Sequence, residues 1–290
     1  MIGILLKRTS GFYYVFAEDQ LWECSLRGRF RIHDQDFLPG DRVWIQPGLG
    51  KKATIEKVEP RRNQLVRPPV TNIDQVYIVF ACRAPEPDLH LLDRLLVQAE
   101  HADIQPVLVV TKKDLSPETG PAGLPWFMYQ AMGYSVYHIS VRTGEGIAEL
   151  RPTLAEKISI VAGPSGVGKS SLLNALSPGL SLKTGEVGKK LQRGRHTTRH
   201  VEMMPCAAGL IADTPGFSNL FLPAMRREEL AGYFRDFQPY LGQCRFQNCR
   251  HDREPDCEIK AALREGRIEE SRYRHYLAFL HETIENERRY

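Results

Sequence analysis

A phosphate-binding sequence occupies residues 163–170, where the chain reads Gly-Pro-Ser-Gly-Val-Gly-Lys-Ser. It follows an apolar run at 158–162 and precedes a helical pattern, which is the context that the G-x-x-x-x-G-K-S motif requires. Glycines let the backbone curl so that its N–H groups face phosphates at a helix N-terminus. Lys169 would add positive charge at the β- and γ-phosphates, where it is also a candidate catalytic residue, and Ser170 would ligate Mg²⁺. The candidate phosphate-binding residues of this loop are Gly163, Ser165, Gly166, Val167, Gly168, Lys169, Ser170 and Ser171.

A second phosphate-facing segment reads Asp-Thr-Pro-Gly at residues 213–216, directly after the apolar run 209–212. A position at a strand end would let Asp213 hold the Mg²⁺ shell, and the Gly216 N–H would then reach a γ-phosphate. Taken alone, these four residues are a common turn sequence. Their position after the phosphate loop favours the nucleotide interpretation.

A base-reading motif is suggested by Thr-Lys-Lys-Asp at residues 111–114, after the apolar run 106–110. It resembles the N/T-K-x-D motif of GTPases, in which Asp114 would accept hydrogen bonds from the N1 and N2 donors of guanine and Lys112 would pack its stem along the ring. Thr111 stands where Asn is usual and lacks the side-chain amide. Ser140 and Val141 resemble the final guanine loop, in which a backbone N–H meets the base O6, but an ordinary loop after a strand explains these two residues equally well.

The order of these motifs is itself informative. In the usual GTPase the phosphate loop precedes the guanine loops, whereas here the guanine motifs come first. A circularly permuted domain can keep the same sheet, because domain termini lie at the surface and often near each other. We therefore predict a circular permutation in which residues 151–157 bridge the original ends.

The segment 183–200, between the phosphate loop and Asp213, carries six Lys or Arg residues and three glycines. We predict a cationic switch loop in which Thr197 or Thr198, with Thr198 favoured, closes on Mg²⁺ and the γ-phosphate. Phe217 stands where a Ras-like protein has the Gln that orients the attacking water, so a partner must supply a rate factor of about 10³ to 10⁵. His196 is the candidate for positioning this water, the alternative being an ordinary exposed histidine.

A metal cluster is predicted near the C-terminus, where three cysteines and one histidine fall within 14 residues. This is the ligand set of a closed structural Zn²⁺ site, which leaves no open position for metal catalysis. We expect one Zn²⁺ per chain to stabilise a small, loop-rich region. The alternative is four unconnected residues. The predicted zinc ligands are Cys244, Cys249, His251 and Cys257, and the predicted Mg²⁺ ligands are Ser170, Thr198 and Asp213.

Three structural parts are expected to position these groups. Residues 1–68 show short β-branched and aromatic runs separated by turn signals, which predicts a small all-β domain. Residues 69–222 alternate apolar runs with helical patterns, as in an α/β domain with a mostly parallel sheet. Residues 223–290 are polar and helical in pattern, interrupted by the metal cluster, and end in a charged helix from about residue 268 to residue 286.

Composition adds limits on location and partners. The chain has 290 residues, 42% of them hydrophobic, and no run approaches the roughly 20 apolar residues of a membrane helix. We expect a cytoplasmic protein without a membrane partner. The net charge of +4 comes from residues 1–68, which hold 12 basic and 8 acidic side chains. Apolar and basic positions largely alternate over residues 25–32, which would put Arg27, Arg29 and Arg31 on one side of an extended strand. Such a row suits a phosphate backbone, although a local basic excess is also typical of a solvated face.

Taken together, these motifs and the Arg-His-Thr-Thr sequence at 195–198 resemble the bacterial ribosome small-subunit-dependent GTPase A family over nearly the whole chain. The resemblance implies an RNA-binding OB-fold, a permuted GTPase domain that binds GTP and GDP, and a zinc domain. It further implies late maturation of the small ribosomal subunit, with that subunit and its rRNA as partners and GTP hydrolysis stimulated by the subunit. The family gives the water-positioning role to the histidine before the switch threonines, which is His196 here.

Two other classes of protein remain open on sequence grounds. One is a P-loop ATPase or kinase in which residues 111–114 form an incidental loop. The other is an RNA-binding P-loop NTPase scaffold that uses nucleotide as a conformational switch without ribosomal specificity. We expect the small-subunit-dependent GTPase to be a monomer.

Overall fold

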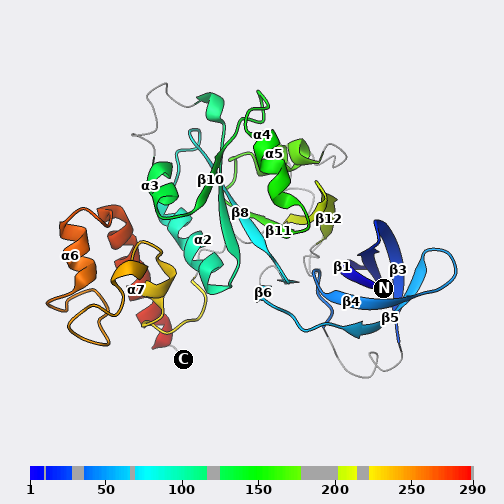
Figure 1. The fold of residues 1–290 in the computed structure, drawn as a ribbon, viewed down its shortest axis with the longest axis horizontal. Coiled ribbons are helices and arrows are strands. Elements are labelled where there is room, and N and C mark those ends of the chain that lie inside the picture. Colours follow the sequence, from blue (N-terminus) through cyan, green and yellow to red (C-terminus); the bar gives the residue numbers. More distant parts are fainter. Residues whose placement is uncertain are drawn as a thin grey trace.

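The computed structural model describes residues 1–9, 11–27, 36–65, 69–115, 125–177, 202–213 and 222–288, with only the backbone of Asp213. Three parts follow one another across Figure 1, with the N-terminal barrel and the C-terminal helices on opposite sides of a central sheet. Within the described residues, no helix is long and apolar enough to cross a membrane.

The N-terminal part is a closed barrel of five strands in the order β1-β2-β3-β5-β4. Alternate side chains point inward, and Leu5, Val15 and Ile55 are among those that fill its core. The predicted strand over 25–32 is shorter than expected: β3 ends at Leu26, Arg27 pairs with Glu56, and Arg29 and Arg31 lie outside the described residues. The strands are β1 (Ile2–Thr9), β2 (Phe12–Ala17), β3 (Gln20–Leu26), β4 (Arg42–Pro47) and β5 (Lys52–Val58).

The barrel is fixed against the central domain by a tight turn. Gly40 has φ +95°, and a Cβ there would lie 2.0 Å from the carbonyl oxygen of Thr71, so only glycine fits. Leu6 of β1 joins the core of the central domain, and Lys7 forms an ion pair with Glu202 at 2.6 Å. The connection contains a small ribbon of β6 (Gln64–Leu65) and β7 (Val70–Thr71), which pair across the predicted domain boundary at residues 68 and 69.

The central domain is a six-stranded sheet in the order β10-β9-β8-β11-β13-β12. Its first five strands are parallel, and β12 is an antiparallel edge strand. The chain runs through β8, β9 and β10 in neighbouring positions and then returns to place β11 on the other side of β8, which is the order expected of a permuted domain. The strands are β8 (Gln75–Ala81), β9 (Gln105–Thr111), β10 (Ser135–His138), β11 (Ile158–Ala162), β12 (Met203–Cys206) and β13 (Gly209–Asp213).

Helices cover both faces of this sheet, each with its own apolar cluster. Leucines of α2 and Trp126 of α3 pack on one face, and residues of α4 and α5 pack on the other. Buried on both sides, the strands read as the continuous apolar runs seen in the sequence. The helices are α2 (Leu89–His101), α3 (Trp126–Ala131), α4 (Ile147–Leu150) and α5 (Lys169–Leu176), with short 3₁₀ segments η1 (Lys113–Leu115) and η3 (Arg151–Leu154).

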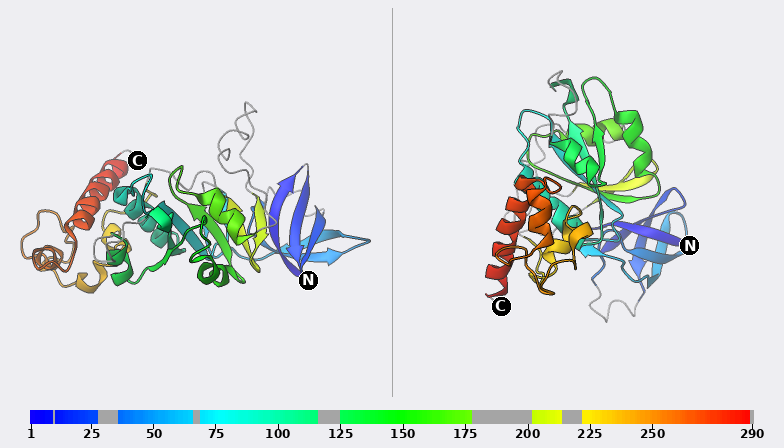
Figure 2. Two further views of the ribbon diagram at one scale, coloured as in Figure 1. Left: turned by 90° about the horizontal axis from the view of Figure 1, so that it is seen from above. Right: turned by 60° about the vertical axis from the view of Figure 1, so that its left-hand side comes forward.

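The C-terminal part packs on α2, as the views in Figure 2 show. The contact is polar at its centre: Asp93 of α2, fully buried, accepts hydrogen bonds from Tyr129, Arg272 and His275. Arg272 also pairs with Asp236 at 2.7 Å. The part consists of η5 (Leu230–Tyr233), η6 (Gln238–Tyr240), α6 (Glu258–Arg264) and α7 (Glu270–Glu287), the last of which matches the predicted terminal helix.

Candidate nucleotide site and metal centre

The predicted nucleotide motifs meet at one edge of the central sheet. Thr111 pairs with Ala81 at the end of β8, and Asp213 pairs with Val161 near the end of β11. Because carboxyl ends of parallel strands lie at the same edge, the loops after β9, β10 and β11 gather there, and β13 ends at that edge with Asp213. Segments separated by up to about a hundred residues in the sequence thus share one site.

Glycines shape the phosphate loop after β11. Gly163 has φ +132°, and a Cβ there would lie 2.1 Å from the carbonyl oxygen of Val79. Gly166 and Gly168 also have positive φ, and Gly168 caps the N-terminus of α5. Val167, 1% exposed, anchors the loop in the core. The loop therefore has the curled backbone, opening a helix, that phosphate binding requires.

This loop and the first turn of α5 carry one ammonium group and three hydroxyl groups. The Lys169 ammonium donates to the carbonyl oxygens of Gly163 at 2.8 Å and Pro164 at 2.6 Å, so its charge lies over the loop. Ser165 is exposed, and Ser170 and Ser171 lie half-buried in the first turn of α5. The residues present fit a Mg²⁺-bound polyphosphate.

Thr111 ties the guanine loop to the phosphate loop despite lacking the usual amide. Its hydroxyl, 2% exposed with the rest of the residue, lies 2.5 Å from the carbonyl oxygen of Val167 and 3.2 Å from that of Phe80. Lys112 adds a second tie, because its ammonium donates to the carbonyl oxygens of Gly166 and Ala84. Thr111 and Lys112, which are neighbours in the chain, thus hold the two loops together.

The Asp114 carboxylate has a side-chain partner on each of its two oxygens. The Ser140 hydroxyl donates to one carboxylate oxygen at 2.6 Å, and Nε of Arg142 lies 2.9 Å from the other. These contacts, with the Ser140 hydrogen bond the larger, hold the pKa of Asp114 below its usual value, so the group is ionised and can accept the donors of guanine. Val141, next along the loop, is half-buried.

Sequence reasoning missed two groups here. Arg142 is the third residue of the last guanine loop and reaches Asp114, and the Cys82 thiol at the end of β8 donates to the Lys112 carbonyl oxygen at 2.8 Å. The sequence did contain a signal for Arg142. It is a cation two residues after the predicted loop serine, and a carboxylate close to that serine therefore also lies close to Arg142.

The γ-phosphate side of the site is described in part. Asp213 ends β13 beside the strand that leads into the phosphate loop. Its side chain and the predicted residues His196, Thr197, Thr198 and Gly216 lie outside the described residues.

The predicted metal ligands come together in the C-terminal part. The ligand atoms of Cys244, Cys249, His251 and Cys257 all lie within 4.8 Å of one another. Sγ of Cys244 is 3.9 Å from Sγ of Cys257 and 3.6 Å from Nδ1 of His251. Tetrahedral Zn²⁺ with ordinary bond lengths sets these separations at about 3.8 and about 3.6 Å. The donor set therefore fits zinc in chemistry and in spacing.

Burial explains why a cation suits this cluster. It raises the pKa of the Cys249 thiol to about 12, with a further increase from neighbouring Cys257, so the thiols ionise readily only when a metal ion takes up the negative charge. Burial lowers the pKa of His251, which keeps the imidazole neutral and able to act as a ligand. Tyr273 and Tyr276 of α7 donate to the carbonyl oxygens of His251 and Arg250, each at 2.7 Å, and so hold the loop on the helix.

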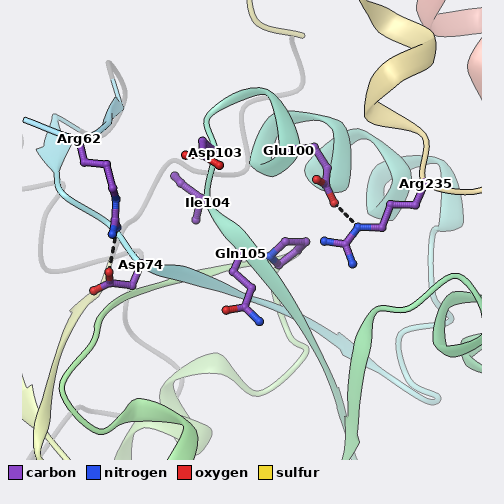
Figure 3. Close-up of a pocket in the computed structure, with 8 residues that line it drawn as sticks. Arg62, Asp74, Glu100, Asp103, Ile104, Gln105 and Arg235 are labelled. Atoms are coloured by element: carbon purple, nitrogen blue, oxygen red, sulfur yellow. Dashed lines mark hydrogen bonds and ion pairs between the residues drawn. The ribbon is translucent and has the colours of Figure 1, made fainter. Parts of the chain in front are cut away.

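A separate cavity of about 350 Å³ lies at the opposite, amino end of the sheet, where the three parts of the chain meet (Figure 3). Arg62 from the connection pairs with Asp74, and Arg235 from the C-terminal part pairs with Glu100. Both guanidinium groups also donate to backbone carbonyls. The cavity is a junction between domains and is remote from the nucleotide motifs.

Comparisons with known proteins agree with this geometry. A family model described as RsgA GTPase matches residues 58–223, and one described as RsgA N-terminal domain matches residues 2–55. The chain is 53% identical to the Small ribosomal subunit biogenesis GTPase RsgA of Moorella thermoacetica and 45% identical to that of Shouchella clausii, with 99% of each chain covered.

Solved structures give the same result for the fold. The chain superposes with a TM-score of 0.83 on YjeQ from Thermotoga maritima (36% identity, 98% of each chain covered). It superposes equally well on YloQ, described as a circularly permuted GTPase (37% identity, 98% of this chain and 95% of that one covered). The predicted barrel and permuted P-loop domain are confirmed.

Proposed function

This chain belongs to the RsgA GTPase family, and from that premise we propose that it binds the small ribosomal subunit and acts in its late maturation. Family membership makes the chain a GTP hydrolase. The observation that carries the guanine-nucleotide part of the proposal is the meeting of the phosphate loop and the Asp114 carboxylate at one edge of the sheet, joined through Thr111. The names of the relatives support the small subunit as the partner.

In this proposal different described residues bind different parts of the nucleotide. Asp114, Ser140 and Val141 read the guanine, Lys112 and Thr111 hold that loop on the phosphate loop, and the loop itself surrounds the phosphates of GTP or GDP. Lys169 supplies positive charge near the β- and γ-phosphates. This charge stabilises the transition state more than the ground state, because negative charge develops on the phosphate oxygens during phosphoryl transfer. Support comes from the curled backbone, the position of the ammonium and the lowered pKa of Asp114.

The remaining catalytic roles rest on sequence. Ser170, Asp213 and Thr198 are the proposed Mg²⁺ ligands, and Mg²⁺ when bound neutralises charge on the β- and γ-phosphates. Thr197 and Gly216 are the proposed contacts to the γ-phosphate, and His196 is the proposed residue that positions water. With Phe217 at the usual Gln position, we propose a low intrinsic rate that the ribosomal subunit raises.

We further propose one structural Zn²⁺ held by the four-residue cluster of Cys244, Cys249, His251 and Cys257. Its support is the chemistry of the four ligands and the fit of the separations among Cys244, His251 and Cys257 to a tetrahedral site. The remaining proposals are rRNA binding by the barrel, a monomeric chain and a cytoplasmic location. The excess of basic residues in 1–68 supports the rRNA contact.

The deciding experiment measures GTP turnover by the purified chain with and without small ribosomal subunits. We expect the subunit to raise the rate, and large subunits to leave it unchanged. Unaltered turnover would instead favour the scaffold alternative. Competition between GTP and ATP addresses the remaining class, because a preference for ATP would remove the guanine assignment of residues 111–114.

A further inference from the structure

Arg142 holds the second oxygen of the carboxylate that faces the base. Its Nε lies 2.9 Å from Oδ2 of Asp114, while Oδ1 accepts the Ser140 hydroxyl at 2.6 Å. The Asp114 side chain is 12% exposed and that of Arg142 is 76% exposed. Arg142 therefore reaches the carboxylate from the solvent side, and Ser140 reaches it from the protein side.

The backbone that carries Arg142 is fixed by its own turn. The Ser140 N–H donates to the Glu145 carbonyl and the Gly144 N–H donates to the Ser140 carbonyl, both at 2.9 Å, and the Thr143 N–H donates to the Ser140 hydroxyl at 3.2 Å. Glu145 also forms an ion pair with Lys113 of the other guanine loop. These contacts therefore fix the position of the Arg142 backbone relative to Asp114.

The other cations near this carboxylate have different partners. Lys112 donates to the carbonyl oxygens of Gly166 and Ala84, and Lys113 pairs with Glu145. The Cys82 thiol, which also lies near Asp114, has a raised pKa because of burial and so stays neutral. Among the described residues, Arg142 is therefore the cation that pairs directly with Asp114.

Acceptor capacity shows what this pairing achieves. A carboxylate accepts about four hydrogen bonds, two on each oxygen. The Ser140 hydroxyl uses one site on Oδ1 and the Arg142 guanidinium forms an ion pair with Oδ2, so acceptor sites remain for the two adjacent donors of guanine, N1–H and N2–H. The terminal torsion of an aspartate is otherwise broad, so a carboxylate held at one oxygen only can turn out of the plane of the base.

We infer that Arg142 is a positioning residue for base recognition, which keeps both oxygens of Asp114 directed at the edge of the guanine. The inference rests on the proposed guanine-reading role of Asp114. It assigns Arg142 a part in choosing a base with two adjacent donors over a base with one.

The test is a double-mutant cycle on nucleotide affinity. Arg142→Ala should weaken GDP binding about threefold, within the range of about 1.4- to 5-fold that an exposed ion pair supports. In the Asp114→Asn variant, measured with xanthosine diphosphate, the carboxylate is gone and Arg142→Ala should change affinity less than about 1.5-fold. Arg253→Ala, which removes a 94%-exposed charge in the C-terminal part, is the control for general charge effects and should leave GDP binding unchanged.

A second measurement uses single variants alone, in case Asp114→Asn does not fold. Inosine diphosphate lacks the 2-amino donor of guanine. The ratio of the affinity for GDP to the affinity for inosine diphosphate should therefore be smaller in Arg142→Ala than in the wild-type chain. The difference between wild type and Arg142→Ala should also shrink at high salt, because the pair is exposed.

Three results overturn the inference. Unchanged or tighter GDP binding by Arg142→Ala would mean that Arg142 is idle or competes with the base. An equal loss in the Asp114→Asn background would mean that Arg142 only maintains the fold of its loop. If Asp114→Asn keeps a preference for GDP over xanthosine diphosphate, the base-reading role of Asp114 itself fails, and this result identifies the proposed function as the part that is wrong.

Discussion

Removing the Thr111 hydroxyl should loosen the site as a whole, because that hydroxyl forms a buried hydrogen bond between the guanine loop and the phosphate loop. Thr111→Val preserves the shape and β-branching of the side chain and removes only the polar atom. The hydroxyl lies 2.5 Å from the Val167 carbonyl oxygen, in a residue that is 2% exposed. The substitution therefore leaves a buried acceptor without this donor.

The size of the effect follows from that unsatisfied acceptor. Leaving a buried carbonyl without its partner costs about 1–3 kcal/mol. If the cost falls wholly on the nucleotide-bound arrangement, it corresponds to a loss of affinity of about 5- to 140-fold. GTP and GDP should lose affinity equally, because the tie acts on the loop that both nucleotides share and lies away from the γ-phosphate side of the site.

The assay is displacement of a fluorescent guanine nucleotide, with chemical denaturation of the same samples to separate binding from stability. Thr111→Ser is the matched control, since it restores a hydroxyl that can reach the Val167 carbonyl. We expect Thr111→Ser to recover most of the affinity that Thr111→Val loses. Equal losses in both variants, or wild-type affinity in Thr111→Val, would refute the role of this hydrogen bond.

The remaining predictions concern the loop, the metal and the domain contact. Gly163→Ala should abolish nucleotide binding measured by calorimetry, because its Cβ would lie 2.1 Å from the Val79 carbonyl oxygen, whereas Gly166→Ala, with nothing within 4 Å, should be milder; equal effects would contradict the steric argument. Purified protein should contain close to one zinc per chain by mass spectrometry, and the Cys257→Ser variant should lose this zinc. Acidification should release the zinc from the wild-type protein, because the thiolates take up protons. Wild-type protein with less than about half a zinc per chain would contradict the four-ligand site. Arg272→Met should lower the free energy of unfolding by about 3–5 kcal/mol, because it leaves Asp93 and Asp236 buried without their cation. The control Arg274→Met, 68% exposed on the same helix, should change it by less than about 0.5 kcal/mol in the same urea titration, and similar values for the two variants would refute the importance of the buried network.

The sequence by itself determined the features that depend on local backbone chemistry. Glycines at 163, 166 and 168 predict the curled loop because their positive φ values are strained for other residues. Continuous apolar runs predicted the buried parallel strands, and the order of the motifs along the chain was enough to predict the permutation. The spacing from Cys244 to Cys257 predicted the cluster because four ligands in one short loop need little tertiary structure to meet.

Tertiary structure alone decided which distant residues became partners. Thr111 and Val167 are 56 positions apart, and Asp93 and Arg272 are 179 apart. These pairs depend on strand register and on the packing of α7 on α2, which no local pattern encodes. The predicted strand over 25–32 shows the converse, because alternation favours an extended backbone, whereas the pairing of β3 with β5 ends at Leu26 and Ile55. Arg142 reached Asp114 for the same reason: β9 and β10 are neighbours in the sheet, and their ends bring the two loops together.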